Sequence, residues 1–290
     1  MPIQPVPTTI EGQPAVCLRL PEGDRVTVAL QGAQALSWVT GDGVERLYSS
    51  PKARWDGHSP MRAGVPLCWP QFNRRGSLPK HGFARNLLWT PAPAASEDPR
   101  AADGARLAFT LRDSPASRAL WPHAFDLQLT VALAPQRLRI ELQVQNTGDA
   151  PWRFTTALHS YLRLDDIARV QLEGLQGAPC WDALRDERFT EPAPTLRFEA
   201  LRGEAIDRVY TPPAQSLRLV QPAGVLEIAR SPSCTETVVW NPGAQLCGEL
   251  PDMPAGGWRH MLCVEAARID APVQLESGAQ WLCWQQLRVI

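Results

Sequence analysis

The chain has 290 residues, with 29 basic and 30 acidic side chains and a formal net charge of −1. A nucleic-acid or membrane-surface protein needs a broad basic face, so this balance argues against both partners and confines any anion binding to a local site. A chain of this length can bury a sizeable core, and no composition break divides it, so we expect a single domain over residues 1–290.

The N-terminal segment predicts the compartment. Residues 1–14 lack the basic and apolar regions of a secretory signal, and no apolar run approaches the ~18 residues that span a bilayer. The seven cysteines are odd in number and include no CxxC pair, which is typical of reduced thiols rather than a disulfide framework. We therefore expect a cytoplasmic protein. We also expect it to be a monomer.

A purely basic segment follows. Residues 57–96 contain no Asp or Glu, and they hold arginines, a lysine and two histidines interleaved with Trp69 and Phe83. One interpretation is a solvated loop that carries charge for solubility. The other is a binding site, because arginine binds phosphate through a planar fork and aromatic faces stack on sugar rings. The composition favours a site for a small phosphorylated sugar.

The rest of the chain is dominated by alternation of period two. Apolar and polar residues alternate in 106–112, 126–134, 137–146, 216–221 and 225–231, which is the pattern of half-buried strands. Residues 90–105, rich in Ala and Pro, are expected to form a surface loop, and Ser114 is expected to cap a short helix. With 28 prolines and 20 glycines between the runs, the pattern predicts an all-β fold, an antiparallel sandwich or barrel.

His159 lies in a strand-like run in which Ala157, His159 and Tyr161 share one face. It could be a hydrogen-bonded core histidine, or a proton donor held on a rigid strand, since an ordinary histidine pKa of about 6.5 suits proton transfer near neutrality.

Two carboxylates are further candidates. Glu265 shares a strand face with Met261 and Cys263, and burying a carboxylate among apolar neighbours is costly unless it is paired. It is either an edge residue that reaches water or pairs with Arg268, or a general base whose pKa is raised by burial. Asp207, in "EAIDRVY", is either a cap or surface ion pair, or a functional group.

Several familiar motifs are absent from the sequence. It contains no Gly-rich phosphate loop, no HExxH, no GxSxG and no Cys/His spacing suited to zinc. These absences argue against nucleotide chemistry and metal-dependent hydrolysis. Acid–base chemistry by histidine and carboxylates remains.

Six segments in order resemble one family. "RAGVPLCWPQF" followed by "SLPKHGFARNLLW" is similar to the paired motifs of hexose-6-phosphate mutarotases, also called glucose-6-phosphate 1-epimerases, in the aldose 1-epimerase superfamily. "FTTALHSYLRL", "AIDRVY", "VVWNP" and "MLCVEAA" resemble later motifs of the same family. The resemblance extends over residues 20–288 and implies a large antiparallel β-sandwich of the galactose mutarotase type, a supersandwich.

The resemblance also implies roles for individual residues. His159 would be the general acid and Glu265 the general base. Arg62 and Arg85 would bind the phosphate of the substrate. His81 and Asp207 would bind or orient the sugar. Five more are possible cleft residues: Trp69, Gln71, Arg74, Lys80 and Trp240.

The implied reaction interconverts the α and β anomers of an aldohexose 6-phosphate, with D-glucose 6-phosphate the expected substrate and no metal or organic cofactor. Two alternatives stay open. A sugar-binding module could keep the cleft without the chemistry. A glycoside hydrolase or lyase could use Asp207 and Glu265 as its two carboxylates.

Overall fold

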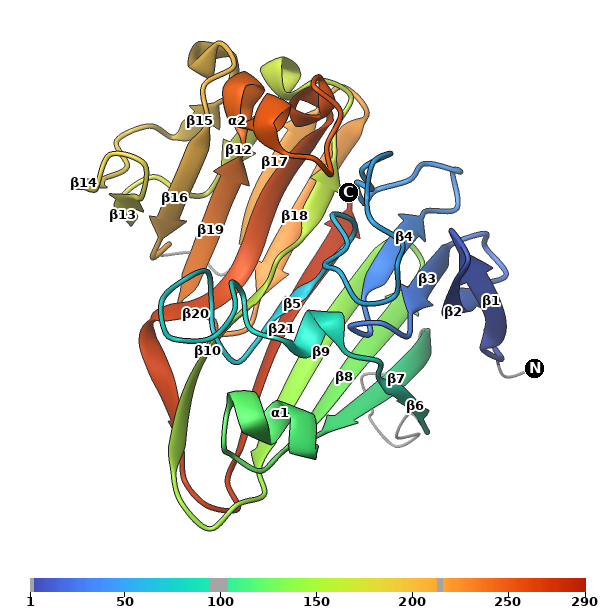
Figure 1. Cartoon of the computed structure of the whole chain (residues 1–290). Coiled ribbons are helices and arrows are strands. Elements are labelled where there is room, and N and C mark those ends of the chain that lie inside the picture. Colours follow the sequence, from blue (N-terminus) through green and yellow to red (C-terminus); the bar gives the residue numbers. More distant parts are fainter. Residues whose placement is uncertain (1–2, 94–103, 213–215) are drawn as a thin grey trace.

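The computed structural model describes residues 3–93, 104–212 and 216–290, and three antiparallel sheets make up its architecture (Figure 1). The N-terminal sheet has the order β1-β2-β3-β4, with strands β1 (Val6–Ile10), β2 (Gln13–Arg19), β3 (Arg25–Ala29) and β4 (Ala35–Val39). The eight-stranded sheet has the order β14-β13-β16-β19-β20-β10-β5, and β11 also pairs with β20. Its strands are β5 (Leu67–Cys68), β10 (Trp152–Leu158), β11 (Tyr161–Arg163), β13 (Pro179–Asp182), β14 (Glu187–Thr190), β16 (Ile206–Tyr210), β19 (Glu236–Asn241) and β20 (Met261–Leu275).

The nine-stranded sheet has the order β15-β12-β17-β18-β21-β9-β8-β7-β6. Its strands are β6 (Thr90–Ala92), β7 (Ala105–Arg112), β8 (Phe125–Ala134), β9 (Arg137–Asn146), β12 (Gln171–Glu173), β15 (Thr195–Arg197), β17 (Ser216–Gln221), β18 (Gly224–Arg230) and β21 (Gln280–Val289). The helices are α1 (Pro115–Leu120) and α2 (Gly243–Glu249), with single 3-10 turns at Ala84–Asn86, Ile167–Arg169, Glu199–Leu201 and Gly257–His260.

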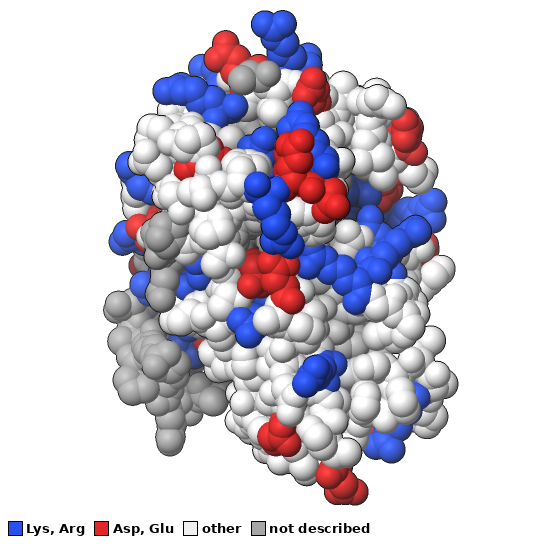
Figure 2. Space-filling model, turned by 90° about the vertical axis from the view of Figure 1, so that its left-hand side faces the viewer, with Lys and Arg blue, Asp and Glu red and all other residues white. Residues whose placement is uncertain are grey.

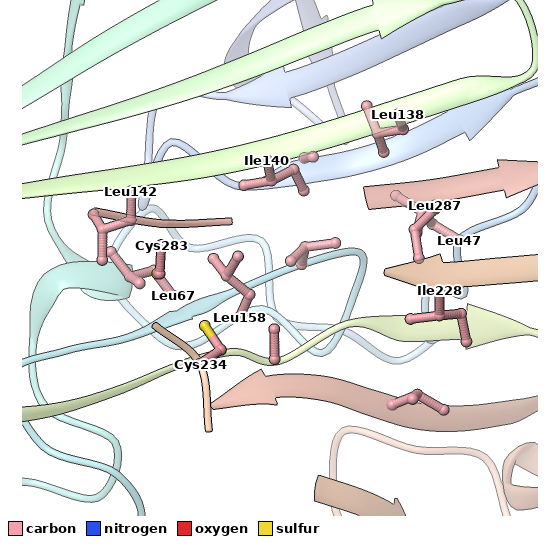
Figure 3. Close-up of a cluster of buried hydrophobic side chains, with 14 of the residues drawn as sticks. Leu47, Leu67, Leu138, Ile140, Leu142, Leu158, Ile228, Cys234, Cys283 and Leu287 are labelled. Atoms are coloured by element: carbon pink, nitrogen blue, oxygen red, sulfur yellow. The ribbon is translucent and has the colours of Figure 1, made fainter. Parts of the chain in front are cut away.

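The period-two pattern predicts these strands correctly. In β9 every second residue is buried, as the alternation in 137–146 requires. The buried side chains of β8, β9, β18 and β21 meet those of the eight-stranded sheet in one apolar layer, part of which is drawn in Figure 3. The predicted antiparallel sandwich is therefore confirmed, because each large sheet buries one face against the other.

The predicted short helix is also confirmed. The backbone N–H of Ser117 donates to the Ser114 hydroxyl at 3.2 Å, and the Ser117 hydroxyl accepts from the Ser114 N–H at 2.8 Å, so the two residues form a capping box at the start of α1. The expectation of a loop over 90–105 is wrong at its ends, because β6 lies there as the edge strand of its sheet and Ala105, the first residue of β7, pairs with Leu133 of β8. Residues 94–103 lie outside the described part of the chain.

One large cluster of buried apolar side chains includes residues of all three sheets. All seven cysteines are free, and six of them are buried. Within the described residues, neither helix is long and apolar enough to cross a membrane.

Candidate active site

A cavity of about 480 Å³ opens on the face of the eight-stranded sheet that is turned away from the nine-stranded sheet. Strand register explains which side chains enter it. Asp207 pairs with Trp240, Trp240 with Cys263, and Cys263 with Tyr161, so side chains of four neighbouring strands point to the same face. Eight of the residues singled out from the sequence line this cavity: Arg62, Lys80, His81, Arg85, His159, Asp207, Trp240 and Glu265.

His159 and Glu265 form a buried pair at the bottom of the cavity. The Nε2 atom of His159 lies 3.4 Å from Oε1 of Glu265, and the two side chains are 9% and 1% exposed. The other polar atoms of the pair, Nδ1 of His159 and Oε2 of Glu265, are buried without a hydrogen-bond partner in the protein. Buried polar atoms are nearly always paired, so Nδ1 and Oε2 keep unused hydrogen-bonding capacity in two residues that line the cavity.

Burial disfavours the charged form of both residues. It raises the pKa of Glu265 well above its usual range, and the nearby Asp207 raises it further while Arg85 opposes the shift. Burial also lowers the pKa of His159 to about 3, and the positive charges of Arg85 and Arg62 add to that effect. Because the charged form of each residue is disfavoured, both residues are suited to exchange a proton with a bound ligand.

His81 is held in one tautomer beside this pair. Its Nδ1 accepts the backbone N–H of Asn73 at 3.3 Å and lies 3.0 Å from the Cys68 sulfur, so the ring proton is on Nε2. Burial lowers the pKa of His81 far below its usual value. His81 is therefore a neutral hydrogen-bond donor on the cavity wall, with its ring 5.4 Å from that of His159.

The local turn explains why glycine follows His81. His81 has a φ of 66° and Gly82 a φ of 71°. A Cβ atom on Gly82 would lie 2.1 Å from the backbone oxygen of Trp69. Only glycine fits such a close approach of two backbones, and this contact brings His81 and Arg85 to the cavity.

Three cations line the cavity. Arg62 is held by an ion pair between its Nε and Oδ1 of Asp252 at 2.9 Å and by donation to the Tyr161 hydroxyl at 3.2 Å. Arg85 donates to the backbone oxygen of Lys80 at 2.9 Å. Burial, and then the charges of Arg85 and Arg62, lower the pKa of Lys80. A bound anion would relieve this repulsion.

The positive charge is a local feature. On the side of the molecule drawn in Figure 2, basic and acidic side chains are interspersed and no broad region of one sign is visible. This agrees with the near-neutral total charge. The cavity cations therefore suit a small anion better than an extended polyanion.

Asp207, on β16, also lines the cavity. Burial raises its pKa to about 6, while the positive charges of Lys80 and Arg75 act in the other direction. Among the described residues, no group of three or more His, Cys, Asp or Glu side chains is arranged to hold a metal ion.

Comparison with known proteins identifies the family. The family model described as aldose 1-epimerase matches residues 14–288. The chain belongs to the aldose 1-epimerase family. Enzymes of this family act on small sugars, and the cavity described above is of a size for such a ligand.

Relatives and solved structures agree with this assignment. A protein of Cenchrus ciliaris named "Putative glucose-6-phosphate 1-epimerase" is 32% identical over 281 residues, covering 94% of this chain and 84% of the relative. A protein of the same name from Escherichia coli K12 is 34% identical over 249 residues, covering 84% and 79%. A solved structure described as "a putative mutarotase (YeaD) from Salmonella typhimurium" has a TM-score of 0.86 at 29% identity, covering 99% of this chain and 96% of that one. The galactose mutarotase-like sandwich is thus confirmed.

Two residues expected at the cleft of this aldose 1-epimerase family member lie elsewhere, and those predictions are wrong. Trp69 is fully buried and packs its ring in the core between the sheets, 4.7 Å from that of Phe125 and 5.1 Å from that of Trp121. Gln71 is buried beneath the loop and donates to the backbone oxygens of Asn73 and Leu78. Its amide therefore stabilises the loop and does not line the cavity.

The two adjacent arginines of the basic segment also lie outside the cavity lining. Arg74 is exposed on the loop. Arg75 is held by an ion pair to Asp270 at 3.0 Å and lies over the Trp181 ring at 4.7 Å. Arg75 thus fastens the loop to the eight-stranded sheet. Arg74 stays a possible cleft residue, because its positive charge helps to lower the pKa of Lys80, which lines the cavity.

Sequence reasoning missed two site residues. Tyr161 stacks on His159 with ring centroids 4.8 Å apart and an interplanar angle of 12°. Tyr161 follows His159 by two positions, and residues so spaced on a strand point to the same face, so the sequence could have predicted this neighbour. Asp252 lies in the segment between α2 and β20 and pairs with Arg62 across 190 positions of sequence, and no local pattern indicates that contact.

Proposed function

We propose that this chain interconverts the α and β anomers of an aldohexose 6-phosphate, with D-glucose 6-phosphate as the first substrate to test. The observation that carries the proposal is the buried His159–Glu265 pair, which lines the same cavity as Arg62, Lys80 and Arg85. The relatives named as glucose-6-phosphate 1-epimerases support the same substrate class.

In the proposed reaction Glu265 takes the proton of the C1 hydroxyl while His159 gives a proton to the ring oxygen. The bond between C1 and the ring oxygen breaks, and an open-chain aldehyde forms. Rotation about C1–C2 presents the other face of the carbonyl. The reverse proton transfers then close the ring. Each positioned acid or base typically contributes about 10²–10⁴-fold, which suffices for a reaction that also proceeds in water.

The phosphate has a second role in this proposal. The positive charges of Arg62 and Arg85 lower the pKa of His159. A phosphate bound to these arginines would neutralise that charge and raise the pKa of His159, which favours the state with the mobile proton of the pair on His159 and Glu265 ionised. Substrate binding and the protonation needed for ring opening would thus be coupled. Unphosphorylated sugars lack this effect.

Other residues take supporting roles in the proposal. His81 donates its Nε2 hydrogen to a sugar oxygen, and Asp207 accepts from a sugar hydroxyl. Trp240, 6.1 Å from the His159 ring, offers an apolar face to the sugar.

We further propose that the chain acts as a single-domain monomer in the cytoplasm. One core cluster shared by all three sheets and six buried free thiols support the domain count and the reducing compartment.

The test is magnetisation-transfer NMR of anomer exchange with glucose 6-phosphate, with glucose and galactose as matched controls. Faster exchange of the phosphorylated sugar alone is the expected result. Equal acceleration of anomer exchange for all three sugars would support the epimerase activity but contradict the phosphate-binding site. Absence of acceleration would leave a sugar-binding module, and release of reducing sugar from an oligosaccharide would instead identify a glycosidase.

A further inference from the structure

The strand ladder is interrupted at the catalytic pair. From Thr156 onward the pairings of β10 and of β11 with β20 keep one register, so His159 lies opposite Glu265 and Ser160 lies opposite Val264. Strand β10 ends before His159 and β11 begins after Ser160. The pair proposed to do the chemistry is therefore at a break between two strands, where regular hydrogen bonds do not hold the backbone.

The break leaves one carbonyl without its usual donor. In a hydrogen-bonded antiparallel pair the two residues exchange both N–H···O bonds. Here the Val264 N–H donates to the Ser160 oxygen at 3.3 Å, but the Ser160 N–H turns away and donates to the oxygen of Leu158 at 3.0 Å. The Val264 oxygen thus lacks the N–H that a continuous β10 would supply.

The side chain of Gln285 replaces that donor from the opposite sheet. Its Nε2 donates to the Val264 oxygen at 2.8 Å, and its Oε1 accepts from the Ser160 hydroxyl. Gln285 is 3% exposed, and the buried residues on either side of it in β21, Cys283 and Leu287, belong to the apolar layer drawn in Figure 3. A buried amide is costly unless it is fully bonded, so a glutamine at this position needs a specific reason.

We propose that Gln285 is a positioning residue for the catalytic pair, an inference that rests on the proposed function. Its two hydrogen bonds clamp Ser160 and Val264, the residues next to His159 and Glu265 on the two strands. Because neighbouring side chains on a strand point to opposite faces, the clamp acts from the core while the catalytic side chains face the cavity. It sets the 3.4 Å separation of His159 and Glu265.

The test compares Gln285→Met with Leu287→Ala. Methionine has a similar volume but makes neither hydrogen bond, whereas Leu287→Ala leaves a cavity two residues along the same buried face. We expect both variants to lower the melting temperature. Gln285→Met alone should lower kcat for glucose 6-phosphate about tenfold to a hundredfold with KM nearly unchanged, since small misplacements of reacting groups cost this much. A kcat for Gln285→Met that matches that of Leu287→Ala would overturn the inference.

A milder variant guards against loss of the fold. Ser160→Ala removes only one of the two bonds and should lower kcat by part of the Gln285→Met effect. Because the clamp acts as a unit, the double variant should be no slower than Gln285→Met. Losses that multiply in the double variant would mean that the two residues act separately, and the clamp would be rejected.

A spectroscopic readout separates this inference from the proposed function. The ring ¹⁵N signals of His159, assigned by their loss in His159→Gln, report the hydrogen bonding of both nitrogens without any substrate. They should move in Gln285→Met and stay in place in Leu287→Ala, even if the wild-type chain exchanges no anomers. Coincident His159 signals in Gln285→Met and wild type would refute the positioning role whatever the activity.

Discussion

Replacing Asp207 by asparagine should make the protein more stable at neutral pH while weakening its binding of sugar. Asparagine has the same shape and keeps an oxygen that can accept a hydrogen bond, but it carries no charge. Asp207 has a pKa of about 6 in the folded protein, against an ordinary value of 3.8, chiefly because it is buried in the cavity wall. The ionised carboxylate of Asp207 therefore lowers the stability of the folded protein.

The sign and size of that cost follow from proton linkage. A raised pKa in the folded state means that the folded protein binds the proton more tightly, so the extra stability is present below about pH 4 and is lost as pH rises to about 6. At about 1.4 kcal/mol per pH unit, a pKa of about 6 instead of 3.8 corresponds to about 3 kcal/mol. Asp207 faces a cavity that water can enter, so we expect Asp207→Asn to recover about 1–3 kcal/mol at pH 7.

The assay is urea unfolding of both proteins at intervals from pH 4 to pH 8. The difference in unfolding free energy should grow between pH 4 and 6 and then stay constant. Asp149→Asn, the same change at an exposed turn, serves as the control and should follow the wild-type curve. Parallel curves for wild type and Asp207→Asn over the whole range would refute the reasoning. In the same variant the KM for glucose 6-phosphate should rise.

Three further predictions concern the other residues of the site and the core. Glu265→Gln should fold normally and lose the catalysed anomer exchange, a drop of about 10²–10⁴-fold by NMR, and a near-normal rate would remove Glu265 as the base. Arg85→Leu should raise the KM for glucose 6-phosphate about tenfold to a hundredfold, the value of a charge-assisted hydrogen bond, and an equal effect on glucose would contradict phosphate binding. Trp69→Ala should cost about 3–5 kcal/mol in denaturant unfolding, whereas a stable variant with a raised KM would place Trp69 at the cleft after all.

The sequence alone determined which residues share a strand face. Strand alternation is a local property, so the pattern around His159 and around Glu265 predicts that each side chain points the same way as its neighbours two positions away. The same pattern predicts β9 and its alternating burial. The even charge balance and the basic segment together predict a local anion site, and the cations Arg62 and Arg85 do line the cavity.

The tertiary structure alone decided which face meets the cavity and which meets the core. Trp69 and Arg85 lie in the same basic segment, yet one is buried between the sheets and the other lines the cavity. Gln285 lies within β21 of the nine-stranded sheet, but its hydrogen-bond partners Ser160 and Val264 lie on the side of the eight-stranded sheet. The contact between Gln285 and Ser160 joins residues 125 positions apart. No local periodicity encodes it, because it depends on how the two sheets stack.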